Sequence, residues 1–207
     1  MAKTMNNSIR LERPSAALIE QYIEKYNADE KYSSIDSSLK MLFEKFPKNT
    51  SLDEVLLKAT AVNSLYNTNI YDVFPVAKHI VALKVDDDLQ KHIADVVQRI
   101  ARLRTNKGEI NFYSFATKYC SWHEPVAYPI YDSFVEKILV EYQKEFDFFS
   151  FSKSDLRDYP RFIEVLEKFL AAFGLSGVSL KELDKFLWFY AKELFPSQQT
   201  KRKAVLI

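Results

Sequence analysis

The stretch Tyr128-Pro129-Ile130-Tyr131-Asp132-Ser133-Phe134-Val135 lies in the most informative part of the chain, residues 111–139. A loop with a proline and several aromatic residues leads to one carboxylate, Asp132, which we expect in the first turn of an apolar helix. A carboxylate in that place either caps the helix or belongs to a catalytic site, where the helix dipole keeps it ionised. The role of Asp132 therefore decides what the protein does.

Apolar residues at helical spacing recur on both sides of this stretch and predict an all-α fold of about eight helices. The expected helices cover residues 14–27, 35–46, a segment from 51, and 71–83, 89–103, 132–146, 159–173 and 179–195. Capping boxes are expected where Ser51 precedes Glu54 and where Ser179 precedes Glu182. No short segment shows the alternation of apolar and polar residues that is typical of a strand.

The composition excludes several classes of protein. With only 3 glycines and no GxGxxG or P-loop pattern, the chain has no site for a nucleotide cofactor of the usual kind. One cysteine, Cys120, cannot form an intramolecular disulfide, which favours a reducing compartment. We find neither an apolar signal core nor an apolar run that could span a membrane. The expectation is a cytoplasmic monomer of 207 residues, with no membrane association.

Positive charge is concentrated in residues 99–118, although the whole chain carries a net charge of only +1. Within that segment five basic residues face one acidic residue, Glu109, which is a local excess of four positive charges. Such a concentration is suited to binding phosphate groups, and it is equally compatible with a solvated basic helix end. The basic tail, residues 197–207, is expected to be frayed.

The order of these features resembles the helix-hairpin-helix DNA glycosylase superfamily, and is nearest to its 8-oxoguanine glycosylase branch. That family carries apolar-Pro-Val-Asp-Thr-His-Val where this chain has Tyr128 to Val135, with two residues instead of one between proline and aspartate. Leu56-Leu57-Lys58-Ala59-Thr60-Ala61-Val62-Asn63 resembles the helix that opens the six-helix lobe of these enzymes. Tyr66-Asn67-Thr68-Asn69-Ile70 is similar to their Asn-rich turn. The resemblance covers roughly residues 56–139.

The chain departs from the family pattern at two places. The family hairpin is Leu-Pro-Gly-Val-Gly, whereas Ile110-Asn111-Phe112-Tyr113-Ser114 has no glycine that would let backbone amides approach a phosphate. The lysine of the lyase members falls on Ser114. Lys118 lies one helical turn later and shares a helix face with Ser114.

The resemblance implies a two-lobed helical domain and an activity. Residues 50–130 would form a six-helix-like lobe with the hairpin region, and residues 1–49 together with 131–196 a second lobe. The implied activity is removal of a modified or damaged base from double-stranded DNA, by hydrolysis of the N-glycosidic bond after base flipping. Asp132 would be the catalytic carboxylate, and Lys118 would contact phosphate or act as a lyase nucleophile. A monofunctional enzyme is favoured over a lyase.

Further site residues follow from the same resemblance, each beside a structural alternative. The DNA-binding candidates are Asn67, Asn69, Arg104, Lys107 and Ser114, and the base-pocket candidates are Trp122, His123, Tyr128 and Tyr131. The asparagines are equally suited to forming turns, the aromatic residues to core packing, and Asp132 to capping alone. The three histidines and the single cysteine do not have metal-ligand spacing, so no metal and no cofactor are expected.

Two functions from other classes stay open. The first is a non-catalytic DNA-binding module in which Asp132 only caps its helix. The second is a helical interaction protein, for instance in bacterial or phage defence, with the aromatic helix 183–195 as its partner surface. Salt-sensitive duplex binding without base release would support the first, and oligomerisation without DNA affinity would support the second.

Overall fold

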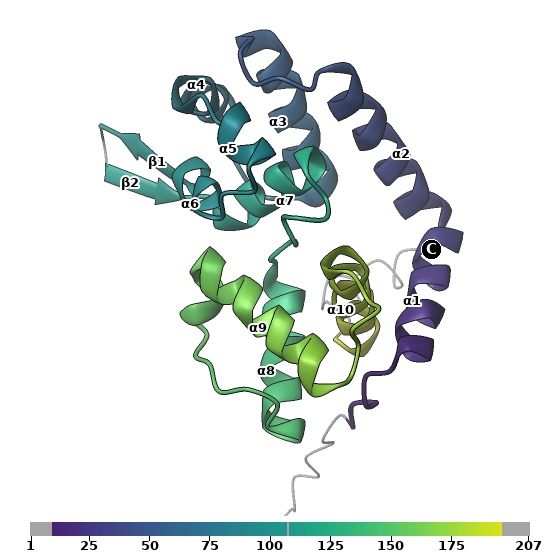
Figure 1. Ribbon diagram of the computed structural model, residues 1–207. Helices are drawn as coiled ribbons and strands as arrows, with labels where there is room; N and C mark the ends of the chain where they lie inside the picture. Colours follow the sequence, from purple (N-terminus) through teal and green to yellow (C-terminus); the bar gives the residue numbers. More distant parts are fainter. Residues whose placement is uncertain (1–9, 107, 196–207) are drawn as a thin grey trace, which may run out of the picture.

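A computed structural model describes residues 10–106 and 108–195 (Figure 1). The described chain is mostly helical, with ten α-helices, one 3-10 turn and one two-stranded sheet. The elements are, in chain order, α1 (Ala16–Ala28), α2 (Glu30–Lys45), α3 (Leu52–Tyr66), α4 (Phe74–Leu83), α5 (Asp86–Gln90), α6 (Asp95–Ala101), β1 (Arg102–Thr105), β2 (Gly108–Asn111), α7 (Tyr113–His123), α8 (Ser133–Phe146), η1 (Asp155–Arg157), α9 (Tyr159–Ala172) and α10 (Leu180–Leu194). Among the described helices, none is long and apolar enough to cross a membrane.

Apolar helix faces are buried against one another in a single continuous core. Helix α10 packs between α8 and α1, while α3, α4, α6 and α7 pack together at the other end of the molecule (Figure 1). Helices α1 and α2 run along one side and connect the two ends, because α1 contacts α10 and α2 contacts α3 and α7. Side chains from both predicted lobes belong to the same core; the division into lobes stays a prediction.

Helix starts follow local capping chemistry in most places. The capping box of Ser179 with Glu182 is present at the start of α10, and Asp158 caps α9 by accepting from the Arg161 N–H. The box expected of Ser51 with Glu54 is wrong, because the Ser51 side chain makes no capping hydrogen bond. The fourth helix begins at Phe74 rather than at residue 71, since Pro75 suits the first turn of a helix.

The expectation of one helix over residues 89–103 is also wrong. The chain instead forms α5, a turn at His92 with φ of 56°, α6 and then β1. Strands β1 and β2 pair antiparallel with Thr105 opposite Gly108, whose φ of 125° suits glycine. Each strand has only four residues, too short for the alternation of side chains to be recognised in the sequence. The all-α prediction therefore holds except for this hairpin.

Candidate active site

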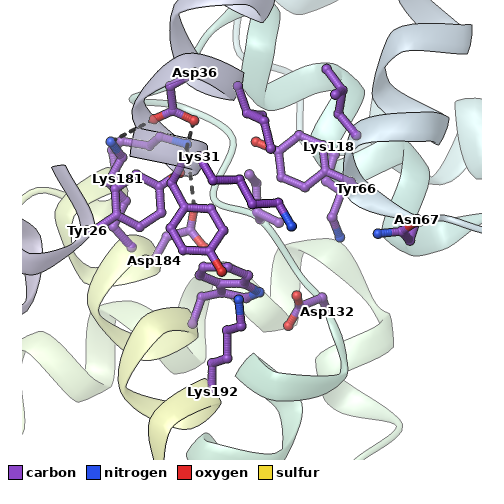
Figure 2. A pocket seen from close by; sticks show the side chains of 16 residues that line it. Tyr26, Lys31, Asp36, Tyr66, Asn67, Lys118, Asp132, Lys181, Asp184 and Lys192 are labelled. Carbon is purple, nitrogen blue, oxygen red and sulfur yellow. Dashed lines mark hydrogen bonds and ion pairs between the residues drawn. The ribbon is translucent and has the colours of Figure 1, made fainter. Parts of the chain in front are cut away.

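A cavity of about 160 Å³ lies between α1, α2, α7 and α10, next to the end of α3 and the loop before α8 (Figure 2). Its wall combines lysines, aspartates and aromatic rings. The lysines are Lys31, Lys118, Lys181, Lys185 and Lys192; the aspartates are Asp36, Asp132 and Asp184; the aromatic residues are Tyr26, Tyr32, Tyr66 and Trp188. Five lysines against three aspartates leave an excess of two positive charges when all are ionised. Such a wall suits a flat molecule that carries negative charge.

Asp132 has a structural role and faces the cavity as well. It is the N-cap of α8, and its Oδ1 accepts from the backbone N–H groups of Phe134 (2.9 Å) and Val135 (3.0 Å). Among the described residues no hydrogen bond reaches Oδ2, and Figure 2 shows the carboxylate facing the cavity. The cap interpretation is thus confirmed, but it uses one oxygen and leaves the other for a ligand.

Lys118 lines the same cavity from α7 and is 3% exposed. Its Nζ donates to Ser114 Oγ at 2.7 Å and, at 3.3 Å, to the carbonyl oxygen of Tyr131. It also lies 5.6 Å from the centre of the Tyr66 ring. Burial lowers the pKa of Lys118, against the opposing effect of Asp132 and Asp184. A buried amine of this kind loses its proton more readily than a solvated lysine does.

The loop before α8 is fastened to its neighbours, and this fastening places Asp132 in the cavity wall. Thr117 Oγ1 of α7 accepts from the Tyr131 N–H at 3.2 Å and donates to the Tyr131 carbonyl oxygen at the same distance. The hydroxyl of Tyr159 donates to the Pro129 carbonyl oxygen at 2.9 Å. The residues that the sequence singles out around Pro129 therefore form a rigid support for the site.

Asp184 is a site residue that the sequence analysis missed. It lies on α10, is 4% exposed, and has Lys181 Nζ at 3.6 Å. Burial is the main cause that raises the pKa of Asp184 to about 6, Asp132 adds to it, and Lys181 opposes it. The signal in the sequence was an acidic residue on the apolar stripe of a helix, between Leu180 and Leu187.

The structure brings Asn67 to the cavity along with Asp132 and Lys118, but not the other predicted residues. Asn67 and Asn69 have φ of 51° and 60°, so both form turns, and Asn67 ends α3. Ser114 does not line the cavity, and its hydroxyl accepts a hydrogen bond from Lys118 Nζ. Lys107 and the basic tail lie outside the described residues.

Arg104 lies apart from the cavity. Its side chain on β1 is 91% exposed, with Glu109 at 3.9 Å. Figure 1 shows the β1–β2 hairpin projecting from α6, on the side of the molecule opposite to α2. The basic hairpin and the cavity are therefore two separate positively charged features.

The residues predicted to form a base pocket lie outside the lining of the cavity. Tyr128 is 1% exposed, and its hydroxyl donates to the carbonyl oxygens of Asp88 and Ile93. Tyr131 is buried and hydrogen-bonded to Glu136. None of the four predicted residues, Trp122, His123, Tyr128 and Tyr131, lines the cavity. The rings that do so come from α1, α2, α3 and α10.

Trp122 contacts a residue of the cavity wall, whereas His123 lies among residues that do not line the cavity. The Trp122 Nε1 donates to the hydroxyl of Tyr66 at 3.2 Å and so supports a residue of the wall. Burial and the neighbouring Lys58 lower the pKa of His123 to about 3, so the imidazole is neutral near pH 7. His123 contacts Phe43 and Tyr119 ring to ring.

Comparison with known proteins places the chain in a family. The family model described as HI_0787_N, N-terminal domain, matches residues 18–127, more than half of the chain. The chain belongs to the HI_0787_N family. An uncharacterized protein of Haemophilus influenzae (strain Rd) is 40% identical over 152 residues, which are 73% of each chain. No solved structure matches.

The match to HI_0787_N covers only part of the cavity. Residues 18–127 include Lys31, Tyr66 and Lys118, whereas Asp132 and Asp184 follow the matched segment. Neither the family description nor the name of the relative states an activity. The cavity is therefore the feature of the molecule from which a function can be inferred.

Proposed function

We propose that this protein is a DNA N-glycosylase that removes a modified base by hydrolysis of the N-glycosidic bond. The observation that carries the proposal is that Asp132 and Lys118 line the same aromatic-lined cavity, with the Asp132 carboxylate facing it. The likeness of residues 128–135 to the aspartate segment of helix-hairpin-helix glycosylases supports it. This family relationship is part of the proposal.

The chemistry follows from what bond cleavage requires. As the bond between base and sugar breaks, its electron pair leaves with the base and the sugar becomes an oxocarbenium-like cation. The Asp132 carboxylate stabilises that cation and takes the proton from the water that attacks the sugar. A flipped base would stack on Tyr26, Tyr66 or Trp188, which line the cavity instead of the rings predicted from the sequence.

Lys118 has a more specific role here than a contact to duplex phosphate. A lysine that is 3% exposed does not reach the backbone of a duplex on the protein surface. Its lowered pKa and its place in the cavity support an amine that can attack the C1′ aldehyde of the base-free sugar after ring opening. The carbonyl oxygen leaves as water, and the C1′–nitrogen double bond of a Schiff base forms in its place. Water stays the proposed nucleophile of base release, with lyase action as a second step. Borohydride would then trap a DNA adduct in the wild type that Lys118→Gln does not form.

The test is base release from duplexes that carry uracil, 8-oxoguanine, alkylated or hypermodified bases, read as strand cleavage after alkali. Asp132→Asn keeps a capping side chain and removes the carboxylate. The matched control is Asp158→Asn, because Asp158 also caps a helix and does not line the cavity. The proposal expects release that is lost in Asp132→Asn and kept in Asp158→Asn.

Two results would contradict the proposal. One is release that persists in Asp132→Asn. The other is duplex binding that falls steeply with salt while no base of the panel is released, which would favour the non-catalytic DNA-binding module.

A further inference from the structure

Lys31 and Lys192 differ from two other lysines of the cavity in their ion pairing. Lys181 and Lys185 form ion pairs, with Asp184 at 3.6 Å and with Asp36 at 2.9 Å. Among the described residues, neither Lys31 nor Lys192 forms an ion pair with a carboxylate. Lys31, Lys192 and Lys118 therefore remain against the single carboxylate of Asp132, which accounts for the excess of two positive charges.

Lys31 and Lys192 approach the same space from different helices. Lys31 lies on α2 and Lys192 on α10, about 160 residues apart in the sequence, and Figure 2 shows both side chains directed into the cavity. Burial, together with the positive charge of Lys31, lowers the pKa of Lys192, against the opposing effect of Asp29. Two like charges that are held together in this way favour a multivalent anion between them.

Aromatic rings lie beside these amines. The Lys192 Nζ is 4.4 Å from the centre of the Tyr32 ring and 4.9 Å from that of Trp188. The rings of Tyr32 and Trp188 pack edge to face, with their centres 5.2 Å apart. The rings hold the long Lys192 side chain in place, which reduces the entropy lost when it binds an anion. An anion with a flat aromatic part matches both features of this wall.

We propose that Lys31 and Lys192 bind a phosphate group of a nucleotide, whose sugar and base occupy the Asp132 and Lys118 side of the cavity. This inference deepens the proposed function and rests on it for the orientation of the nucleotide. A lysine amine is a point charge well suited to phosphate, and two of them match a terminal phosphate monoester with a charge of about −1.5 to −2 at neutral pH. An internal phosphodiester offers the same chemistry with one negative charge.

The experiment is a titration followed by tryptophan fluorescence, since Trp188 is one of only 2 tryptophans and touches Lys192. The probes are deoxynucleoside 5′-monophosphates, the matching nucleosides, inorganic phosphate, and dinucleotides with and without a 5′-phosphate. The wild type is compared with the double variant Lys31→Gln and Lys192→Gln. Lys40→Gln is the control, because Lys40 lies on α2 and pairs with Glu44 at 3.8 Å on the surface.

We expect the monophosphates to bind at least about tenfold more tightly than the nucleosides, and the double variant to lose that advantage while Lys40→Gln keeps it. Equal binding of nucleosides and monophosphates, or an unaffected double variant, would overturn the proposal. A preference for dinucleotides with a 5′-phosphate identifies a terminal phosphate, and equal binding of the two dinucleotides with the lysine dependence intact identifies an internal one.

Failure of this inference is distinguishable from failure of the proposed function. Lysine-dependent nucleotide binding without any base release would leave the phosphate site and remove the glycosylase. Base release that is insensitive to Lys31→Gln and Lys192→Gln would leave the glycosylase and remove the phosphate site.

Discussion

Two buried lysines, Lys58 on α3 and Lys118 on α7, have opposite surroundings. Lys58 is fully buried, and its three ammonium protons are directed to the carbonyl oxygens of Phe46 and Lys48 and to Asn49 Oδ1, at 2.8–2.9 Å. Lys118 donates one short hydrogen bond, to Ser114 Oγ at 2.7 Å, and two longer ones, to the carbonyl oxygens of Tyr131 at 3.3 Å and Ser114 at 3.4 Å. Lys58 is enclosed by its partners, whereas Lys118 faces a cavity.

The difference separates a structural charge from one available for a ligand. Asn49 ties the Lys58 region together, since it also accepts from Tyr119 and donates to Asp86. This network fastens the segment after α2 to α3, α5 and α7. Satisfied polar groups of this kind fix packing. A buried cation with two long hydrogen bonds, beside two carboxylates and a cavity, is suited to a reactive site. We therefore expect mutations in the first region to affect stability and those in the second to affect activity.

The largest expected effect is on activity at Asp132. Both Asp132→Asn and Asp132→Ala should lower base release by about 10²-fold or more, since each removes the carboxylate. Only Asp132→Ala should lower the free energy of unfolding, by about 1 kcal/mol, because alanine does not cap α8. Urea unfolding and the excision assay measure the two effects separately. Equal losses of stability in both variants would contradict the division of roles in the Asp132 carboxylate, in which one oxygen caps α8 and the other faces the cavity.

The next effect is on stability in the Lys58 region. Asn49→Ala leaves Lys58, Tyr119 and Asp86 without a shared partner and should cost about 3 kcal/mol of unfolding free energy. Base release per folded molecule should stay at the wild-type rate, because Asn49 does not line the cavity. A large loss of activity in the folded variant would show that the two regions are coupled.

A smaller effect concerns the pH dependence of stability through Asp184. Its pKa is raised to about 6 in the folded protein, so its ionisation opposes folding. The cost is absent below about pH 4, grows as the pH rises from about 4 to 6, and is constant above that range. Relative to wild type, Asp184→Asn should thus gain on the order of 2 kcal/mol between pH 4 and pH 7. A difference between the two proteins that does not change with pH would contradict the buried, ionised carboxylate.

The smallest effect is at His123. Because its pKa is lowered to about 3, its NMR ring signals should not shift between pH 5 and pH 8. A transition near pH 6 would place a charged imidazole beside the Lys58 ammonium and contradict the description of that region.

Local features could be predicted from the sequence, and long-range ones could not. The helix start at Asp132, the box at Ser179 and the ends of most helices depend on a few neighbouring residues. The cavity forms where α2 and α10 pack near α7. The sequence around Lys31 and around Lys192 contains no local pattern that predicts this long-range packing. Asp184 had a weak signal, as a charge on an apolar stripe. The β1–β2 hairpin could not be predicted from the sequence, because each of its strands has only four residues.

The most direct test is to compare Lys58→Met with Lys118→Met for unfolding free energy, base release and the borohydride-trapped DNA adduct. We expect one variant to lose stability and the other to lose chemistry. Lys58→Met should lose about 3 kcal/mol and keep its activity per folded molecule, because three buried acceptors lose their donor. Lys118→Met should stay within about 1 kcal/mol of wild type, because the cost of burying the charge disappears with it, and it should lose the borohydride-trapped DNA adduct while base release by water persists. If both variants lose stability and neither loses adduct formation beyond its unfolded fraction, Lys118 is a structural lysine like Lys58.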